Sequence, residues 1–124
     1  MAIREPGPLG TTASLAASGT QIIGNLDCRK VRTVSITCRA TYNASATDAV
    51  RVNLYFSPDG ENYDTIPYTY FDVDVTVSEA CQETAIIDFP EHGYMKIEAY
   101  NQDSSYAATA VSVWSTVVKW GDIQ

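Results

Sequence analysis

Alternating apolar and polar residues recur along the chain between residues 31 and 120. The clearest stretch carries apolar side chains at every second position: Val34, Ile36, Cys38, Ala40 and Tyr42. The residues between them are mostly hydroxylated: Thr33, Ser35, Thr37, Arg39 and Thr41. A period of two places the two sets on opposite faces of a β-strand. The pattern therefore predicts strands with one buried side and one side that faces solvent.

The same alternation continues in segments that turn-forming residues separate. We expect strands at residues 11–17, 21–24, 31–42, 50–57, 65–77, 83–89, 94–100 and 106–120. Turn signals about every ten residues are typical of β-sandwiches and jelly rolls. The sequence predicts an all-β chain with a single antiparallel β-sandwich or jelly-roll-like domain of seven or eight strands. A closed barrel is the alternative.

A run of turn-forming residues, Ser-Pro-Asp-Gly-Glu-Asn-Tyr-Asp-Thr, covers residues 57–65. Proline presets the backbone angle φ at the second position of a turn, and glycine tolerates a positive φ. This run predicts a tight hairpin between two strands.

The first ten residues have a different composition from the rest. Pro6 and Pro8 disfavour a helix and favour an extended backbone. We expect residues 1–10 to form an extended arm, either disordered or laid on a neighbouring surface, and residues 11–124 to form the sandwich.

The last expected strand is apolar on both sides. One side carries Val111, Val113, Ser115 and Val117, and the other carries Trp114, Val118 and Trp120. Since tryptophan is enriched in interfaces, the second side predicts a surface that a partner covers. The alternative is that the strand twists and the tryptophans cover one end of the core.

Length and charge limit the classes of partner. The chain has 124 residues, which suits one domain, and a net charge of −7. Nucleic acid is not expected to bind, because phosphate contacts need a clustered positive field. No apolar run reaches the roughly 20 residues of a membrane helix, and residues 1–10 do not resemble a secretory signal. We expect no membrane partner.

The three cysteines cannot all pair with one another. They are either buried thiols, or Cys28 and Cys38 form a disulfide and Cys81 remains. With one histidine, His92, and no C-x-x-C spacing, we expect neither a metal nor a cofactor. No G-x-S-x-G elbow occurs, so we expect no enzymatic activity.

Three tyrosines flank the central turn: Tyr63, Tyr68 and Tyr70. Alternation places Tyr68 and Tyr70 on one face, where they could form a platform for sugar rings. A carbohydrate-binding module is therefore an alternative function. The competing explanation is that the rings only pack against residues of neighbouring strands and bind no ligand.

Two segments resemble known proteins. Residues 50–65, V-R-V-N-L-Y-F-S-P-D-G-E-N-Y-D-T, and residues 93–101, G-Y-M-K-I-E-A-Y-N, are similar to small β-sandwich virion proteins of tailed bacteriophages, and the likeness covers residues 30–120.

The resemblance implies a structural protein of the virion, either a capsid decoration protein or a tail-associated subunit. It further implies assembly in the host cytoplasm, a homo-oligomer, and binding to a major capsid or tail protein. The contacts expected for this role are the arm at Pro6 and Pro8 and the stripe of Trp114, Val118 and Trp120.

Overall fold

The computed structural model describes residues 2–29, 31–75, 80–87 and 93–120. Within these ranges the chain forms eight strands and no helix, so it has none long and apolar enough to cross a membrane. The strands are β1 (Ala2–Leu15), β2 (Thr20–Asp27), β3 (Val31–Thr41), β4 (Val50–Ser57), β5 (Thr69–Val73), β6 (Ala80–Ile87), β7 (Tyr94–Asn101) and β8 (Ala108–Trp120).

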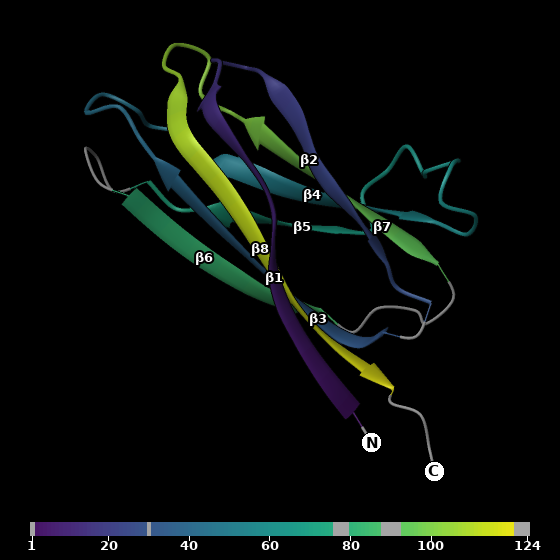
Figure 1. The fold of residues 1–124 in the computed structure, drawn as a ribbon. Coiled ribbons are helices and arrows are strands. Elements are labelled where there is room, and N and C mark those ends of the chain that lie inside the picture. The colour runs from purple at the N-terminus through teal and green to yellow at the C-terminus, as the bar shows by residue number, and fades with distance from the viewer. Residues whose placement is uncertain (1, 30, 76–79, 88–92, 121–124) are drawn as a thin grey trace.

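The described strands make two four-stranded sheets, ordered β1-β8-β3-β6 and β2-β7-β4-β5 (Figure 1). The first strand pairs with the last, and the other pairs are nested within them in the sequence. The pairs are β1 with β8, β2 with β7, β3 with β6 and β4 with β5, each antiparallel. Successive pairs alternate between the two sheets. This nested arrangement is a jelly roll, so the predicted fold class is confirmed.

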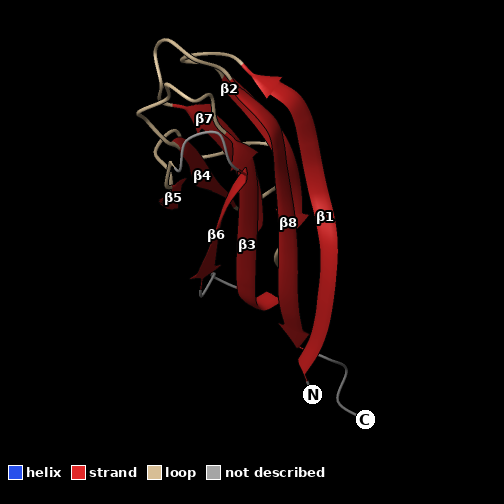
Figure 2. Ribbon diagram, turned by 90° about the vertical axis from the view of Figure 1, so that its left-hand side faces the viewer, coloured by secondary structure: helices blue, strands red, loops and turns tan. Residues whose placement is uncertain are grey.

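One side of each sheet faces the core between the two layers, and Figure 2 shows the β1-β8-β3-β6 sheet in front with strands of the other sheet behind it. The expected alternation holds in β3, where Val34, Ile36 and Cys38 are fully buried and the residues between them are half-buried. From β4 and β7 of the other sheet, the side chains that fill the core are Val50, Val52, Leu54, Met95, Ile97 and Ala99. Burial of one side of each strand removes this apolar area from water and holds the layers together.

The connection between β4 and β5 is longer than the predicted tight hairpin. It covers residues 58–68, and strand pairing begins only at Leu54 and Thr69. Pro67 lacks the N–H that a strand ladder needs, and Ile66 before it is exposed. The strand expected at residues 65–77 is therefore limited to β5, while residues 76 and 77 lie outside the described part of the chain.

The backbone of residues 2–10 belongs to β1 and pairs with β8 of the same chain, so it is not the separate arm that the sequence predicted. Pro6 lies opposite Thr116, and Pro8 lies opposite Trp114. Because β1 is at the edge of its sheet, it needs backbone donors only on the side of β8. A proline, which has no N–H, is tolerated in such a strand where its nitrogen faces the unpaired side. The extended conformation that proline favours is thus used inside the sandwich.

The opposite edge of this sheet, β6, carries a charge on its core side. Glu83 lies opposite the buried Cys38, so both side chains leave the sheet on the same face, yet Glu83 is exposed at the rim. An inward-pointing charge on an edge strand disfavours pairing with another strand.

Tyr42 links the two sheets directly after β3. Its side chain is 3% exposed. The hydroxyl donates to the carbonyl of Val73 and accepts from the N–H of Val50 at 2.8 Å. Val50 and Val73 are partners at the end of the β4–β5 ladder, so a residue leaving one sheet completes the hydrogen bonding of the other. Burial raises the pKa of Tyr42 and keeps the hydroxyl neutral.

Asp103 joins two loops at one end of the sandwich. Its Oδ2 accepts hydrogen bonds from the N–H groups of Thr47 and Asp48, and its Oδ1 accepts from Ser105 and Tyr106. These backbone donors, that of Thr47 most strongly, lower the pKa of Asp103 from 3.8 to about 2. The carboxylate therefore holds the β3–β4 loop against the β7–β8 loop.

Asn101 adds the third loop to the same end. Its Nδ2 donates to the carbonyls of Leu15, Ala16 and Tyr106, and its Oδ1 accepts from the N–H of Asp103. The end of β1 is thereby attached to the loop between β7 and β8.

We expect Tyr42→Phe to lower the free energy of unfolding by about 1–3 kcal/mol, because it leaves a buried N–H and a buried carbonyl without a partner. Urea denaturation measures the change. Tyr106→Phe is the control, since Tyr106 is exposed; a loss for Tyr42→Phe no larger than for the control would contradict the inter-sheet role.

We expect the contribution of Asp103 to stability to be complete above pH 3.8 and to be lost as the pH falls toward about 2, because the pKa is lower in the folded state. Asp103→Asn should be less stable at neutral pH and should lose less stability on acidification. Urea denaturation at a series of pH values measures both, with the exposed Asp48→Asn as control. Parallel pH profiles for Asp103→Asn and the unaltered protein would refute the claim.

Candidate functional site

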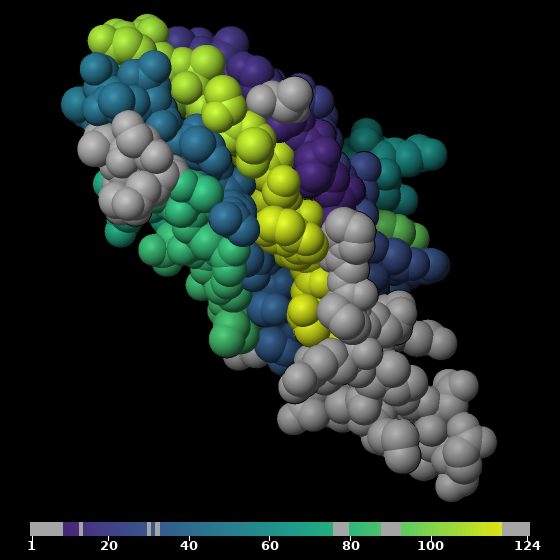
Figure 3. Space-filling view, turned by 60° about the vertical axis from the view of Figure 1, so that its left-hand side comes forward, coloured from purple at the N-terminus to yellow at the C-terminus, as the bar shows by residue number. Residues whose placement is uncertain are grey.

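Two surfaces remain available for function, the outer sides of the two sheets. The first belongs to the β1-β8-β3-β6 sheet, and we call it the threonine face (Figure 3). Its described side chains on β3, β6 and β8 include Thr33, Ser35, Thr37, Arg39, Gln82, Thr84, Ile86, Ser112, Trp114 and Thr116. Arg39 is the single charged residue among these ten.

The predicted division of the last strand is confirmed where its side chains are described. Val113 and Val117 point into the core, and Trp114 lies on the outer side with 38% of its surface exposed. Trp114 therefore does not cover the end of the core. The backbone of Val118 and Trp120 continues β8, but their side chains lie outside the described part of the structure.

Trp114 has hydroxylated neighbours on its sheet. It lies opposite Thr37, and Thr37 and Thr84 share a hydrogen bond of 2.7 Å across β3 and β6. Ile86, 76% exposed, is the other large apolar side chain among those described on β3, β6 and β8. Among the described side chains of this face, those of β3 and β6 nearest Trp114 are short and hydroxylated.

The second surface is the outer side of the β2-β7-β4-β5 sheet together with the 58–68 loop, and we call it the tyrosine face. It holds six of the eight tyrosines of the chain: Tyr55, Tyr63, Tyr68, Tyr70, Tyr94 and Tyr100. The remaining two, Tyr42 and Tyr106, lie in the core and in the loop after β7.

The centre of the tyrosine face is polar. Asn53 on β4 lies opposite Glu98 on β7, and these are the two central strands of the sheet. Oε1 of Glu98 accepts from Nδ2 of Asn53 at 3.4 Å and from the hydroxyl of Tyr55 at 3.3 Å. Burial, with a smaller effect from Glu98, raises the pKa of Tyr55.

Cations lie over the tyrosine rings around this centre. The guanidinium of Arg51 is 4.0 Å from the ring centroid of Tyr70, and its Nε is 2.8 Å from Oδ1 of Asp72. Nζ of Lys96 lies 4.7 Å from the ring centroid of Tyr55 and 5.1 Å from that of Tyr63. Such contacts attract the cation to the ring and orient both groups.

The 58–68 loop is held by its own side chains. Oδ1 of Asp59 accepts from the N–H groups of Glu61 and Asn62, and these bonds lower the pKa of Asp59. Gly60 has a φ of +81°, a conformation that costs other residues free energy. These bonds hold the longer loop together, and Gly60 has the positive φ that the sequence predicted.

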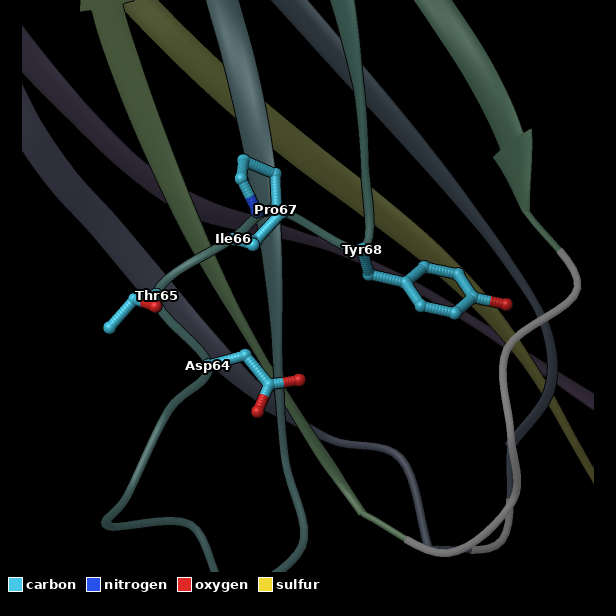
Figure 4. A pocket seen from close by; sticks show the side chains of 5 residues that line it. All are labelled: Asp64, Thr65, Ile66, Pro67 and Tyr68. Carbon is cyan, nitrogen blue, oxygen red and sulfur yellow. The ribbon is translucent and has the colours of Figure 1, made fainter.

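A shallow depression lies in this loop, lined by residues 64–68 (Figure 4). All five labelled side chains come from one continuous stretch, so the depression is a hollow of the loop itself.

The three tyrosines predicted as a sugar platform all belong to the tyrosine face but differ in exposure. Tyr68 and Tyr70 are 47% and 54% exposed, but Tyr63 is half-buried and lies beside Lys96. The prediction missed Tyr55, Tyr94, Tyr100, Asn53 and Glu98. The alternation of residues 94–100 showed which of its side chains share a face, but not that this strand lies beside β4.

Among the described residues, no group of three or more His, Cys, Asp or Glu side chains could hold a metal ion. His92 lies outside the described residues. Cys28 and Cys38 are buried thiols, Cys81 is a half-buried thiol, and the alternative Cys28–Cys38 disulfide is absent from these described residues. Burial raises the pKa of Cys38 to about 12, so this thiol is protonated at neutral pH.

No protein-family model matches the chain, and no curated protein matches it. Solved structures do share the fold. VP2 of the infectious bursal disease virus subviral particle is 11% identical, with a TM-score of 0.61, over 97% of this chain and 33% of VP2. The chain thus spans about a third of that protein's length.

Two other similar structures come from different classes of protein. A carbohydrate-binding module, CBM4, is 13% identical with a TM-score of 0.51, over 84% of this chain and 66% of the module. PliG, a periplasmic inhibitor of g-type lysozyme from Aeromonas hydrophila, is 12% identical with a TM-score of 0.52, over 95% of this chain and 86% of PliG. At these identities the likeness shows the fold alone.

A thiol titration should distinguish the three cysteines. We expect a disulfide-exchange reagent to modify Cys81 first in the folded protein, since Cys28 and Cys38 are buried. Denaturant should then release three equivalents, and Cys81→Ser should remove the early one. Only one equivalent in denaturant would show a disulfide instead.

Proposed function

We propose that this protein is a non-enzymatic structural subunit of a virus particle, a capsid decoration or tail-associated protein of a tailed bacteriophage. It assembles as a homo-oligomer in the host cytoplasm and binds a major capsid or tail protein of the virion. The observation that carries the proposal is the threonine face, whose described side chains on β3, β6 and β8 include an exposed tryptophan and a single charge, Arg39.

The charge distribution supports contact through this face. The chain has a net charge of −7, and like charges repel copies that approach one another. The described side chains of the threonine face on β3, β6 and β8 include no carboxylate, so copies can meet here without bringing acidic groups together. Trp114 supplies the large amphipathic side chain that dominates many interfaces.

The sheet edges favour contact through the face over addition of a strand. Glu83 on β6 and the prolines of β1 protect the two edges of this sheet. The exchange of an N-terminal arm therefore has less support than the contact at Trp114, because residues 2–10 already pair with β8.

A carbohydrate-binding module is the second candidate function. The exposed rings of Tyr68 and Tyr70 favour it, because aromatic rings with a polar edge suit ligands that are partly apolar. It uses the opposite sheet, so the two functions are compatible in one virion protein.

Light scattering of the purified protein tests the main proposal. We expect a discrete oligomer, and we expect Trp114→Ser to weaken its association by about 30-fold or more, as for a central interface residue. Ile22→Ser is the control, since it removes an exposed apolar side chain from the tyrosine face.

Co-sedimentation with capsid and tail particles gives the second measurement. A monomer that sediments with neither kind of particle would refute the structural role. An oligomer that Trp114→Ser leaves unchanged would refute the assignment of the contact to the threonine face.

A further inference from the structure

The central pair of the tyrosine face is partly covered by its neighbours. Asn53 is only 8% exposed, although its strand position turns its side chain away from the core. Its partners across the ladder are Glu98 on β7 and Tyr70 on β5, and Tyr55 lies two residues further along β4. A buried amide and a half-buried carboxylate thus lie side by side at the middle of this face, with Tyr55 and Tyr70 as neighbours.

This arrangement is the reverse of a protein–protein interface. Such interfaces have an apolar centre and a polar rim. Here the centre is the Asn53–Glu98 pair, while Tyr55, Tyr70 and Tyr100 lie around it. A ligand that fits needs hydroxyl groups for the centre and an apolar surface for the rings.

The charges of the sheet around this centre balance. Arg51 and Lys96 are matched by Asp72 and Glu98, and Arg51 is bonded to Asp72 at 2.8 Å. The excess negative charge of the chain is carried elsewhere. This part of the face therefore presents no net field that would select an anionic or a cationic ligand.

The ring of Tyr70 is held in place before a ligand arrives. Arg51 contacts both the ring of Tyr70 and the carboxylate of Asp72, and Tyr70 still keeps 54% of its surface exposed. A ring that is already oriented loses little conformational entropy on binding, which favours affinity.

We infer that the tyrosine face binds a neutral oligosaccharide over the Asn53–Glu98 pair. Asn53 and Glu98 exchange hydrogen bonds with sugar hydroxyls, and Tyr55 and Tyr70 pack against the C–H faces of the sugar rings. The inference deepens the second candidate function and moves the centre of its site from Tyr68 and Tyr70 to the Asn53–Glu98 pair. It does not depend on the role in a particle.

Binding to immobilised and soluble oligosaccharides tests the inference with the intact protein. The probes are xylohexaose, cellohexaose and mannohexaose as neutral ligands, a sulfated heparin hexasaccharide as the anionic control, and a glycan array for breadth. We expect saturable binding of at least one neutral ligand. Silence of all neutral glycans at millimolar concentration would overturn the inference, and so would binding of the sulfated ligand alone.

Matched variants locate the site. Tyr70→Ala and Glu98→Ala should each weaken binding about tenfold or more, since each removes a contact to the ligand. Tyr70→Phe keeps the ring and should bind within about threefold of the unaltered protein. Tyr106→Ala, the same change on the loop after β7, should bind normally. Thermal unfolding checks that each variant is folded.

The outcomes separate the two functions. Trp114→Ser should leave sugar binding unchanged, because Trp114 belongs to the other sheet. Sugar binding that Tyr70→Ala and Glu98→Ala do not weaken would overturn the site, whatever the oligomeric state. Loss of assembly with retained sugar binding would concern the particle role alone.

Discussion

Burial of one side of each strand between two sheets is the interaction on which the other features depend. It uses the apolar half of each alternating segment and leaves the polar half outside. Two outer faces result. The packing of the core does not restrict which residue types occupy the outward positions, so the two faces can differ in composition. The threonine face carries short hydroxylated side chains, and the tyrosine face carries rings and charges. Each candidate function uses one of these faces.

The polar contacts at one end of the sandwich support this division. Tyr42, Asn101 and Asp103 together bond backbone groups from loops of both sheets. Because buried polar groups without partners are costly, these three side chains allow the loops to close over the core. The two sheets are thereby tied to one another at this end by hydrogen bonds as well as by the core.

Much of the fold could be predicted from the sequence, because alternation with a period of two is a local signal. The strand at residues 31–42 and the outward position of Trp114 followed from it. The pairing of β1 with β8 could not be predicted, because it depends on partners that lie far apart in the sequence. Pro6 and Pro8 correctly indicated an extended backbone, but only the register shows that its partner is β8.

The candidate sites were predictable to a similar degree. Tyr68 and Tyr70 were found because they share one face of one segment. Asn53 and Glu98 were missed, since the two become neighbours only when β4 pairs with β7. The tight turn at residues 57–65 was wrong in length, because the side chains of Ser57 and Asp59 stabilise a longer loop. Residue type predicted the turn, but it did not predict where strand pairing resumes.

The nested pairing also has a consequence for the order in which the contacts form. The β4–β5 ladder joins segments that are close in the sequence, whereas the β1–β8 ladder joins Ala2 to Trp120. The entropy lost on closing a loop grows with the length of the loop, and folds rich in distant contacts form slowly. The β1–β8 ladder therefore closes the longest loop in the chain. Closing this loop costs little entropy only after the inner strand pairs have brought the two ends of the chain near each other.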